Sequence, residues 1–160
     1  MYLQTTDVPA SRSIAEVSAI LMRSGATEIL TELAGGQVVG IKFALLIKGE
    51  RVPFALPART AAIFAKLQSQ RPVRAADSKL AIDGRKRDEQ QAPMIAWRQL
   101  LMWLKAQLAL IDTDQVEAGE VFLPYQVLAN GDTVYERVKA LGQQKLNLPA
   151  LPAQPAGTRS

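Results

Sequence analysis

Residues 26–58, ATEILTELAGGQVVGIKFALLIKGERVPFALPA, alternate apolar and polar side chains over three stretches separated by two glycine-containing turns. Alternation with a period of two is typical of strands that bury one face, and glycine adopts the backbone conformations that tight hairpin turns require. Turns at residues 34–36 and 48–49 give two hairpin registers that place the same apolar side chains on one face. This shared face comprises Ile29, Ile41, Phe43, Leu45, Phe54 and Leu56. The stretch therefore predicts a three-stranded antiparallel meander.

The two registers also predict individual neighbours across the strands. Ile41 faces Ile29 in the first hairpin and Leu56 in the second, and Glu28 faces Lys42 on the opposite side of the sheet. Oppositely charged side chains that face each other in this way stabilise strand pairing. The third strand contains two prolines, which cannot donate to a neighbouring strand, so we expect it at an edge of the sheet.

Helices are predicted before and after the meander in the sequence. Ser13–Glu16 has the spacing of a capping box and begins a helix that ends near residue 24, and residues 58–70 form a second helix. Pro93 fits the first turn of a long helix over residues 92–111. The predicted fold class is α+β, with an α-β-β-β-α core followed by a long helix and two short helices.

The two short helices are predicted from their caps. Asp114 with Glu117 has the spacing of a capping box, for a helix that ends before Pro124, and Asp132 is placed to cap a last helix through Leu141. The outer face of the meander is either a binding platform or covered by these C-terminal helices, and we expect the cover, because Val38 and Leu46 on that face would otherwise be exposed.

The expected domain organisation is a single domain over residues 1–145. Within it, residues 71–91 mix charges, glutamines and a glycine without periodicity, and we expect them to form a mobile basic loop. Residues 146–160 are rich in proline and alanine, and we expect a disordered tail there.

The chain contains no cysteine and no histidine, which removes thiolate nucleophiles, cysteine-type zinc sites and the commonest general base near neutral pH. Catalytic triads built on histidine are excluded. We therefore expect a non-enzymatic protein without a cofactor. No apolar run approaches the roughly 18 residues of a membrane span, and the N-terminal residues show no secretory pattern, so we expect a cytoplasmic protein without a membrane partner.

Positive charge is concentrated in the middle of the chain. Residues 59–105 carry ten basic and four acidic side chains, whereas residues 1–58 are neutral overall and residues 106–160 are acidic. Phosphate backbones bind to several cations on a surface that can follow them, so this segment is the candidate nucleic-acid site. The alternative is a solvated surface loop, because acidic residues are interspersed. The candidate contacts are Arg59, Lys66, Arg71, Arg74, Arg85, Lys86, Arg87 and Arg98.

Two tryptophans lie in the predicted long helix. At about 100° per residue, Trp97 falls in the middle of an apolar stripe that we expect to face the core. Trp103 lies on the flank of this stripe with Leu110. We expect one of three contacts for it: packing on another helix, contact with a second subunit, or stacking on a ligand. Trp103 and Leu110 are therefore the candidate contact for a protein partner.

The acidic stretch from Asp112 to Glu120 offers the oxygen ligands that Mg²⁺ and Ca²⁺ prefer. It lacks the glycine and the ligand spacing of an EF-hand loop. Helix capping and a solvated junction account for these carboxylates, so we expect no metal.

The stretches IAWRQLLMWLKAQLALID, EVFLPY and NGDTVYE resemble a group of short uncharacterised proteins encoded by bacteriophages and prophages. GIKFALLIKGERVPFALPAR is similar to the same group, so the likeness spans about residues 11–138. The resemblance implies a phage or mobile-element origin and brings no activity. Separately, α-β-β-β-α is the order of the double-stranded-RNA-binding domain, and related folds occur in phage strand-annealing proteins, which is an analogy of fold alone.

Two hypotheses of function follow. The first is a non-enzymatic nucleic-acid-binding accessory protein of a phage or mobile element, acting in recombination or replication and contacting the phosphates of DNA or RNA. The second is a protein-interaction factor, either an inhibitor of a host system or an assembly component, which binds a host or phage protein or forms a homo-oligomer.

Overall fold

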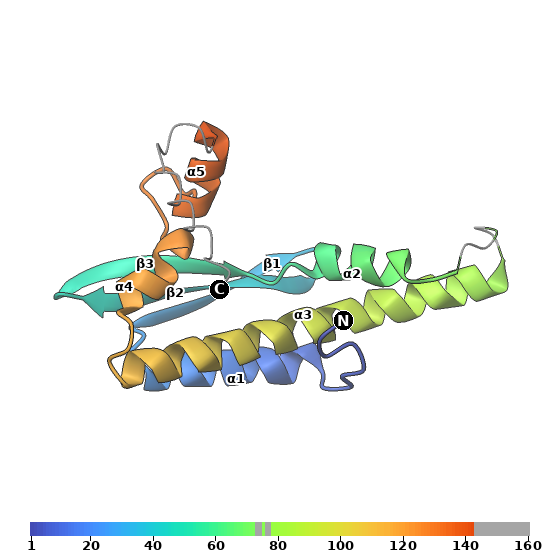
Figure 1. Ribbon diagram of the computed structural model, residues 1–160, viewed down its shortest axis with the longest axis horizontal. Helices are drawn as coiled ribbons and strands as arrows, with labels where there is room; N and C mark the ends of the chain where they lie inside the picture. Colours follow the sequence, from blue (N-terminus) through green and yellow to red (C-terminus); the bar gives the residue numbers. More distant parts are fainter. Residues whose placement is uncertain (73–74, 76–77, 143–160) are drawn as a thin grey trace, which may run out of the picture.

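The computed structural model describes residues 1–72, 75 and 78–142, and it has the predicted α-β-β-β-α arrangement followed by a long helix and short helices (Figure 1). The α+β fold class is confirmed. The elements are α1 (Ala10–Arg23), β1 (Glu28–Ala34), β2 (Gln37–Ile47), β3 (Glu50–Pro57), α2 (Thr60–Ser69), α3 (Lys79–Asp112), α4 (Ala118–Phe122), the 3-10 helix η1 (Leu123–Tyr125) and α5 (Val134–Leu141).

The sheet is an antiparallel meander with β2 in the centre, so the prediction of β3 as an edge strand is confirmed. The predicted second hairpin has the observed register, in which Phe43 lies opposite Phe54 and Ile41 opposite Leu56. The predicted first hairpin is wrong by two residues, because Ile29 lies opposite Phe43 rather than Ile41. The shift is two residues over Glu28–Glu32, which keeps these side chains on their predicted faces, and it falls to one residue nearer the turn.

The glycines explain the shift in the first hairpin. Gly35 and Gly36 both have positive φ, at 57° and 76°, so they form the turn alone and Ala34 remains in the strand. A β-bulge between Glu32 and Leu33 takes up the extra residue.

The shift also changes the ion pairs on the outer face. Glu28 does not face Lys42 but binds Arg51 on β3, with Arg51 Nε 2.9 Å from a carboxylate oxygen. Lys42 instead places its Nζ 2.8 Å from Glu32 Oε1. Both pairs are exposed, so solvent screens them and each contributes little to stability.

The core lies between the inner face of the sheet, α1 and the C-terminal half of α3 (Figure 1). Trp97 is fully buried, as predicted, and its indole N–H donates to the Val38 carbonyl over 3.2 Å. Phe122 of α4 closes the core beside β3, with its ring 5.5 Å from those of Phe43 and Phe54. The buried apolar residues of this core are Val17, Ile20, Leu21, Ile41, Phe43, Leu45, Phe54, Leu56, Ala58, Trp97, Leu101, Leu104 and Phe122.

Helix α1 begins at Ala10, three residues before the predicted start, so the predicted capping box at Ser13 is wrong. Ser13 lies inside the helix, is fully buried, and its hydroxyl has no hydrogen-bond partner among the described residues. Glu16 does not reach back to the helix start. Its carboxylate lies 3.2 Å from Lys105 Nζ and 3.6 Å from Arg98 Nη1 on α3.

The largest departure from prediction is the loop expected over residues 71–91. From Lys79 onward this segment is helical, and it continues without interruption into the long helix, so that α3 has 34 residues with Pro93 in its interior. Ser78 caps the helix by accepting from the Ala81 amide over 3.3 Å. Proline has no amide hydrogen to donate, but a long helix accommodates one such gap with a bend.

Periodicity fails to reveal this helix because its two halves bury different faces. Gly84, Asp88 and Ile95 are buried in the first half, and Trp97, Leu101 and Leu104 are buried in the second. At about 100° per residue, these two stripes lie on nearly opposite sides of the helix. The apolar stripe of the second half therefore extends back only to about Pro93, and the sequence looks as if the helix began there.

The C-terminal helices end where predicted but are capped by other residues. Glu117 with Glu120, rather than Asp114 with Glu117, forms the capping box of α4. Thr133 with Glu136 forms that of α5, so Asp132 is not the cap. The predicted tail, residues 146–160, lies outside the described residues.

The outer face of the sheet is less covered than predicted. Gln126 forms a bridge with Phe54 of β3, the Val127 amide donates to the Pro53 carbonyl, and α5 stands above the sheet (Figure 1). Leu30 and Leu46 are nevertheless 63% and 61% exposed. Helix α5 has only eight residues and contacts mainly η1, so it leaves much of the sheet free.

Candidate nucleic-acid interface

Helix α2 and the first half of α3 lie side by side and extend beyond the end of the sheet (Figure 1). We call this pair, Thr60–Gln70 with Lys79–Ile95, the helical arm. Its small apolar core is separate from the main one: Leu67 of α2 packs on Ala92 and Ile95 of α3, with Ile63 and Phe64 at its margin. The arm therefore carries its own packing and presents its remaining surface to solvent.

A buried carboxylate joins the two helices of the arm. Asp88, whose side chain is only 6% exposed, accepts from Arg71 Nε at 2.7 Å, from Arg71 Nη2 at 2.5 Å and from Gln68 Nε2 at 2.5 Å. The Arg71 hydrogen bonds hold the pKa of Asp88 below its ordinary value, and Asp88 raises the pKa of Arg71 in return. We call these three residues the latch.

Gly84 makes room for the latch. A Cβ at this position would lie 2.9 Å from Arg71 Nη1, so the guanidinium rests directly on the helix backbone. Gly84 and Asp88 are four residues apart and therefore share a face of α3. This spacing was a signal in the sequence, but the assumption of a loop concealed it. Arg71, a predicted phosphate contact, is thus directed at Asp88.

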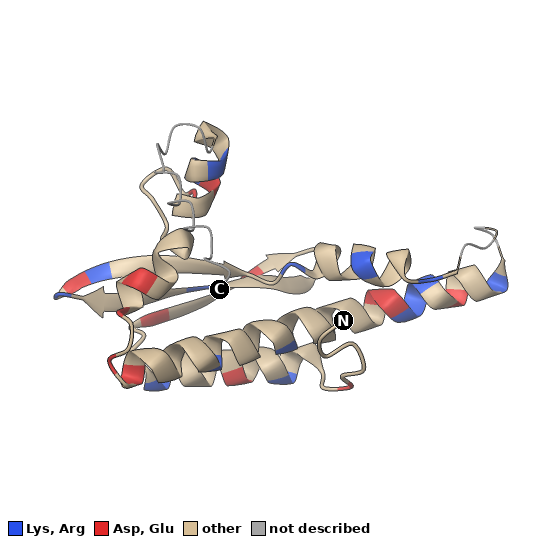
Figure 2. Ribbon diagram, viewed as in Figure 1, with Lys and Arg blue, Asp and Glu red and all other residues tan. Residues whose placement is uncertain are grey.

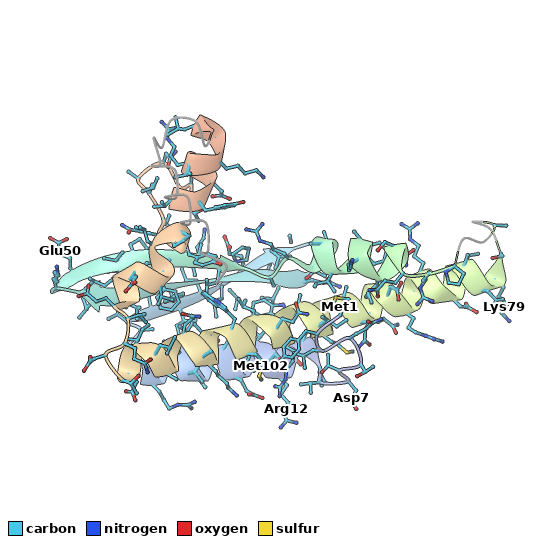
Figure 3. All side chains as sticks on the ribbon, in the orientation of Figure 1. Met1, Asp7, Arg12, Glu50, Lys79 and Met102 are labelled. Atoms are coloured by element: carbon cyan, nitrogen blue, oxygen red, sulfur yellow. The ribbon has the colours of Figure 1, made fainter. Side chains whose placement is uncertain are left out.

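Five cations of the arm are exposed, and Figure 2 shows positive charge along both of its helices. One of them, Arg85, lies 3.3 Å from Glu89 and 5.9 Å above the ring of Phe64. The others make no ion pair within the described residues. Lys79 is at the far end of the arm, away from the hairpin end that carries Glu50 (Figure 3). The five are Lys66, Lys79, Arg85, Lys86 and Arg87.

The remaining predicted contacts lie elsewhere. Arg98 is on the second half of α3, where it faces Glu16, and its side chain is 24% exposed. The Lys105 hydrogen bond and the neighbouring arginines lower the pKa of Glu16. Arg59 is exposed just before α2 and lines a small hollow of about 140 Å³ beside α5. Arg74 lies outside the described residues. Of the predicted contacts, Lys66, Arg85, Lys86 and Arg87 therefore lie together on the arm. Lys79, which was not among the predicted contacts, lies on the arm as well.

The candidate protein contact is partly occupied by the chain itself. Trp103 packs edge-on against Tyr125, with ring centroids 5.5 Å apart, and against Phe122 at 6.1 Å. Of the three predicted alternatives, packing on another element is the one observed. Leu110 is half-buried.

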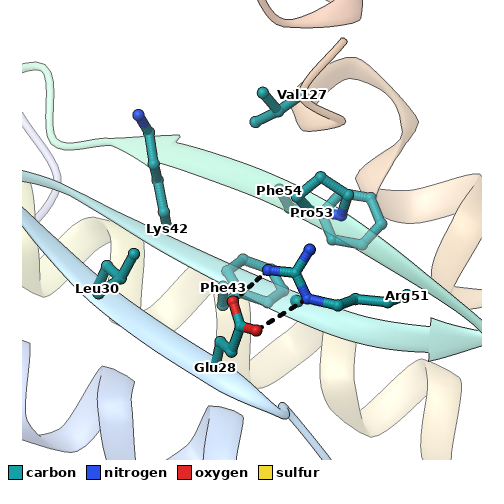
Figure 4. Close-up of a pocket in the computed structure, with 9 residues that line it drawn as sticks. Glu28, Leu30, Lys42, Phe43, Arg51, Pro53, Phe54 and Val127 are labelled. Carbon is teal, nitrogen blue, oxygen red and sulfur yellow. Dashed lines mark hydrogen bonds and ion pairs between the residues drawn. The ribbon is translucent and has the colours of Figure 1, made fainter. Parts of the chain in front are cut away.

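The outer face of the sheet holds a shallow hollow of about 160 Å³ (Figure 4). Ala44 and Pro53 contribute apolar lining, and Lys42 and the Glu28–Arg51 pair lie around it. Both cations are already bound to carboxylates, so the hollow has no free charge to hold an anion.

Among the residues that the structure describes, no group of three or more carboxylates is close enough to hold a metal ion. The acidic stretch from Asp112 to Glu120 instead contains the capping box of α4. Within the same residues, no helix is both long and apolar enough to span a bilayer.

Comparison with protein families, with curated proteins and with solved structures finds no match to this chain. The fold and the arm therefore have to be interpreted from their own geometry.

Proposed function

We propose that this chain is a non-enzymatic nucleic-acid-binding accessory protein that contacts phosphates through the helical arm. Its phage or mobile-element setting, a role in recombination or replication and a cytoplasmic location are part of the proposal. The phage or mobile-element setting rests on the sequence resemblance alone.

The observation that carries the proposal is the arrangement of the arm. Five exposed cations lie on a pair of helices that extends beyond the sheet, and only one of them has an ion pair within the described residues. Cations that are not neutralised by the protein are available to replace the counterions of a phosphate backbone. The absence of cysteine and histidine from the chain supports a binding role rather than a catalytic one.

The test is fluorescence anisotropy with labelled DNA and RNA at two salt concentrations. The variant Arg85→Ala/Lys86→Ala/Arg87→Ala removes three arm cations. We expect its affinity to fall at least tenfold, and the slope of log affinity against log salt to flatten by two to three, because each lost phosphate contact reduces that slope by about one.

The matched control removes the same charge outside the arm. Arg23, Arg137 and Lys139 are exposed and make no ion pair within the described residues. The variant Arg23→Ala/Arg137→Ala/Lys139→Ala should therefore bind as tightly as the wild type. Equal losses in the two triple variants would assign binding to net charge and remove the arm from the proposal.

A second candidate function is protein interaction, and the exposed leucines of the sheet favour it. Leu30, Leu33 and Leu46 are 63%, 70% and 61% exposed, and Leu30 and Leu46 lie on either side of the buried Ala44 on the outer face. Exposed apolar side chains grouped on one face are typical of interfaces. Sedimentation velocity tests this candidate: an oligomer that Leu46→Asp dissociates would support it, and a monomer at high concentration would argue against a homo-oligomer.

A further inference from the structure

We propose that the first half of α3 binds in the major groove of double-stranded DNA. This inference rests on the proposed function and specifies its substrate. The arm supports it in three ways: cations lie on both flanks of the helix, polar side chains line the outward stripe between them, and the helix is backed by α2.

The flanking charge is set by three consecutive residues. At about 100° per residue, Arg85 and Arg87 lie on opposite sides of Lys86, roughly 200° apart around the helix. A single strand lying on a surface presents one backbone, which such a spread would contact with one arginine only. A helix in the major groove has a phosphate strand on each side, so arginines on both flanks are used. The exposed ion pair of Arg85 with Glu89 is weak enough to exchange for a phosphate contact.

The outward stripe between the arginines is polar and exposed. Lys79, Asp83, Lys86 and Gln90 are all exposed, and they fall within a sector of about 60°. Lysine donates to guanine O6 and N7, aspartate accepts from cytosine N4, and glutamine pairs with adenine. Ile82 lies beside this stripe and is 44% exposed, which suits contact with a thymine methyl group.

The opposite side of the same segment is covered by α2. Gly84, Asp88, Ala92 and Ile95 are buried there, held by the latch and by the small apolar core of the arm. The segment is therefore supported along its inner face, and its polar side is open to a ligand.

The dimensions of the segment fit B-form DNA. An α-helix with side chains is about 10–12 Å across, and the major groove is about 12 Å wide. From Lys79 to Gln90 the helix rises roughly 17 Å, which corresponds to about five base pairs at about 3.4 Å each. Duplex RNA has a deep, narrow major groove that does not admit a helix. The same segment should therefore discriminate between the two duplexes.

The first experiment compares one sequence as duplex DNA, duplex RNA and single-stranded DNA, by anisotropy with the full chain. We expect duplex DNA to bind at least tenfold more tightly than the other two. Equal affinity for duplex RNA or for the single strand would overturn the inference while leaving the proposed function intact. Binding to none of the three would remove both.

The second experiment tests the two flanks separately. Arg85→Ala and Arg87→Ala should each lower affinity for duplex DNA about threefold to tenfold and flatten the salt slope by about one, whereas the control Arg23→Ala should change neither. Methylation of guanine N7, in the major groove, should block binding, and methylation of adenine N3, in the minor groove, should not. A loss of affinity in only one of the two arginine variants would overturn the inference, and so would interference by methylation at adenine N3 alone.

Discussion

The latch of the arm allows a prediction with a defined sign and pH dependence. Asp88→Asn keeps the shape of the side chain but removes the charge that accepts from Arg71 and Gln68. Hydrogen bonds to a charged group contribute on the order of 1.5–3 kcal/mol, and breaking a fully buried ion pair costs about 3–5 kcal/mol. Because the Arg71 side chain is 35% exposed, solvent screens part of the attraction between Arg71 and Asp88. We therefore expect Asp88→Asn to lower the free energy of unfolding by about 2 kcal/mol at pH 7.

The pH dependence follows from the lowered pKa of Asp88 in the folded protein. A carboxyl group whose pKa is lower in the folded state stabilises the fold at pH values above its unfolded pKa, about 3.9. That contribution disappears as the pH falls through the folded pKa, because the carboxylate is then protonated in both states. The difference in stability between the wild type and Asp88→Asn should therefore be full at pH 7 and smaller at pH 2.

The assay is urea unfolding at both pH values, together with hydrogen exchange of the arm amides at pH 7. Exchange is included because the arm has its own small core and can open without the rest of the protein. The control is Asp83→Asn, an exposed carboxylate on the outward side of the same helix, which should change stability by less than about 0.5 kcal/mol. Equal stability and equal amide protection in the wild type and Asp88→Asn at pH 7 would refute the assignment of the latch.

Three further changes test other parts of the fold. Gly84→Ala should destabilise the wild type by about 1 kcal/mol, because displacing Arg71 costs more than the higher helix propensity of alanine gains. In the Asp88→Asn variant the same change should stabilise the protein by a similar amount. Urea unfolding of the wild type, the two single variants and the double variant gives the sign in each background. Ser13→Ala removes a buried hydroxyl that has no partner among the described residues, and it should raise the unfolding free energy by about 0.5–1 kcal/mol, visible as a higher melting temperature; a lower one would mean that the hydroxyl is bonded. Phe122→Ala leaves a cavity beside three aromatic rings and should cost about 3–4 kcal/mol; a loss below about 1 kcal/mol, measured by chemical unfolding, would show that α4 does not close the core.

The sheet could be predicted because its information is local. The spacing of Ile41, Phe43 and Leu45 and a two-residue turn at Lys48-Gly49 were enough to give the second register. The first register was wrong because two adjacent glycines allow more than one turn, and a bulge can absorb the residue that differs. Neither the turn nor the bulge moves Ile29, Ile41 or Phe43 from the inner face, so the pattern of these apolar residues does not distinguish the two registers.

The arm could not be predicted from periodicity. Its first helix was found from the apolar stripe of Ile63, Phe64 and Leu67, but the second buries a glycine, a carboxylate and one alanine before it reaches Ile95. An aspartate is seldom fully buried, and Asp88 is buried here because Arg71 and Gln68 donate hydrogen bonds to it. The interaction that hides Asp88 is a tertiary contact, and composition alone gives no sign of it.

The continuous backbone of α3 limits how this protein can change in length. The buried stripes of its two halves are separated by only one residue, between Ile95 and Trp97. One residue inserted there would turn the first half of α3 by about 100° about the helix axis, while the short connection from β3 would still hold the start of α2 at the end of the sheet. A single deletion or insertion at this point should therefore be less well tolerated than several added residues in the α4–α5 connection.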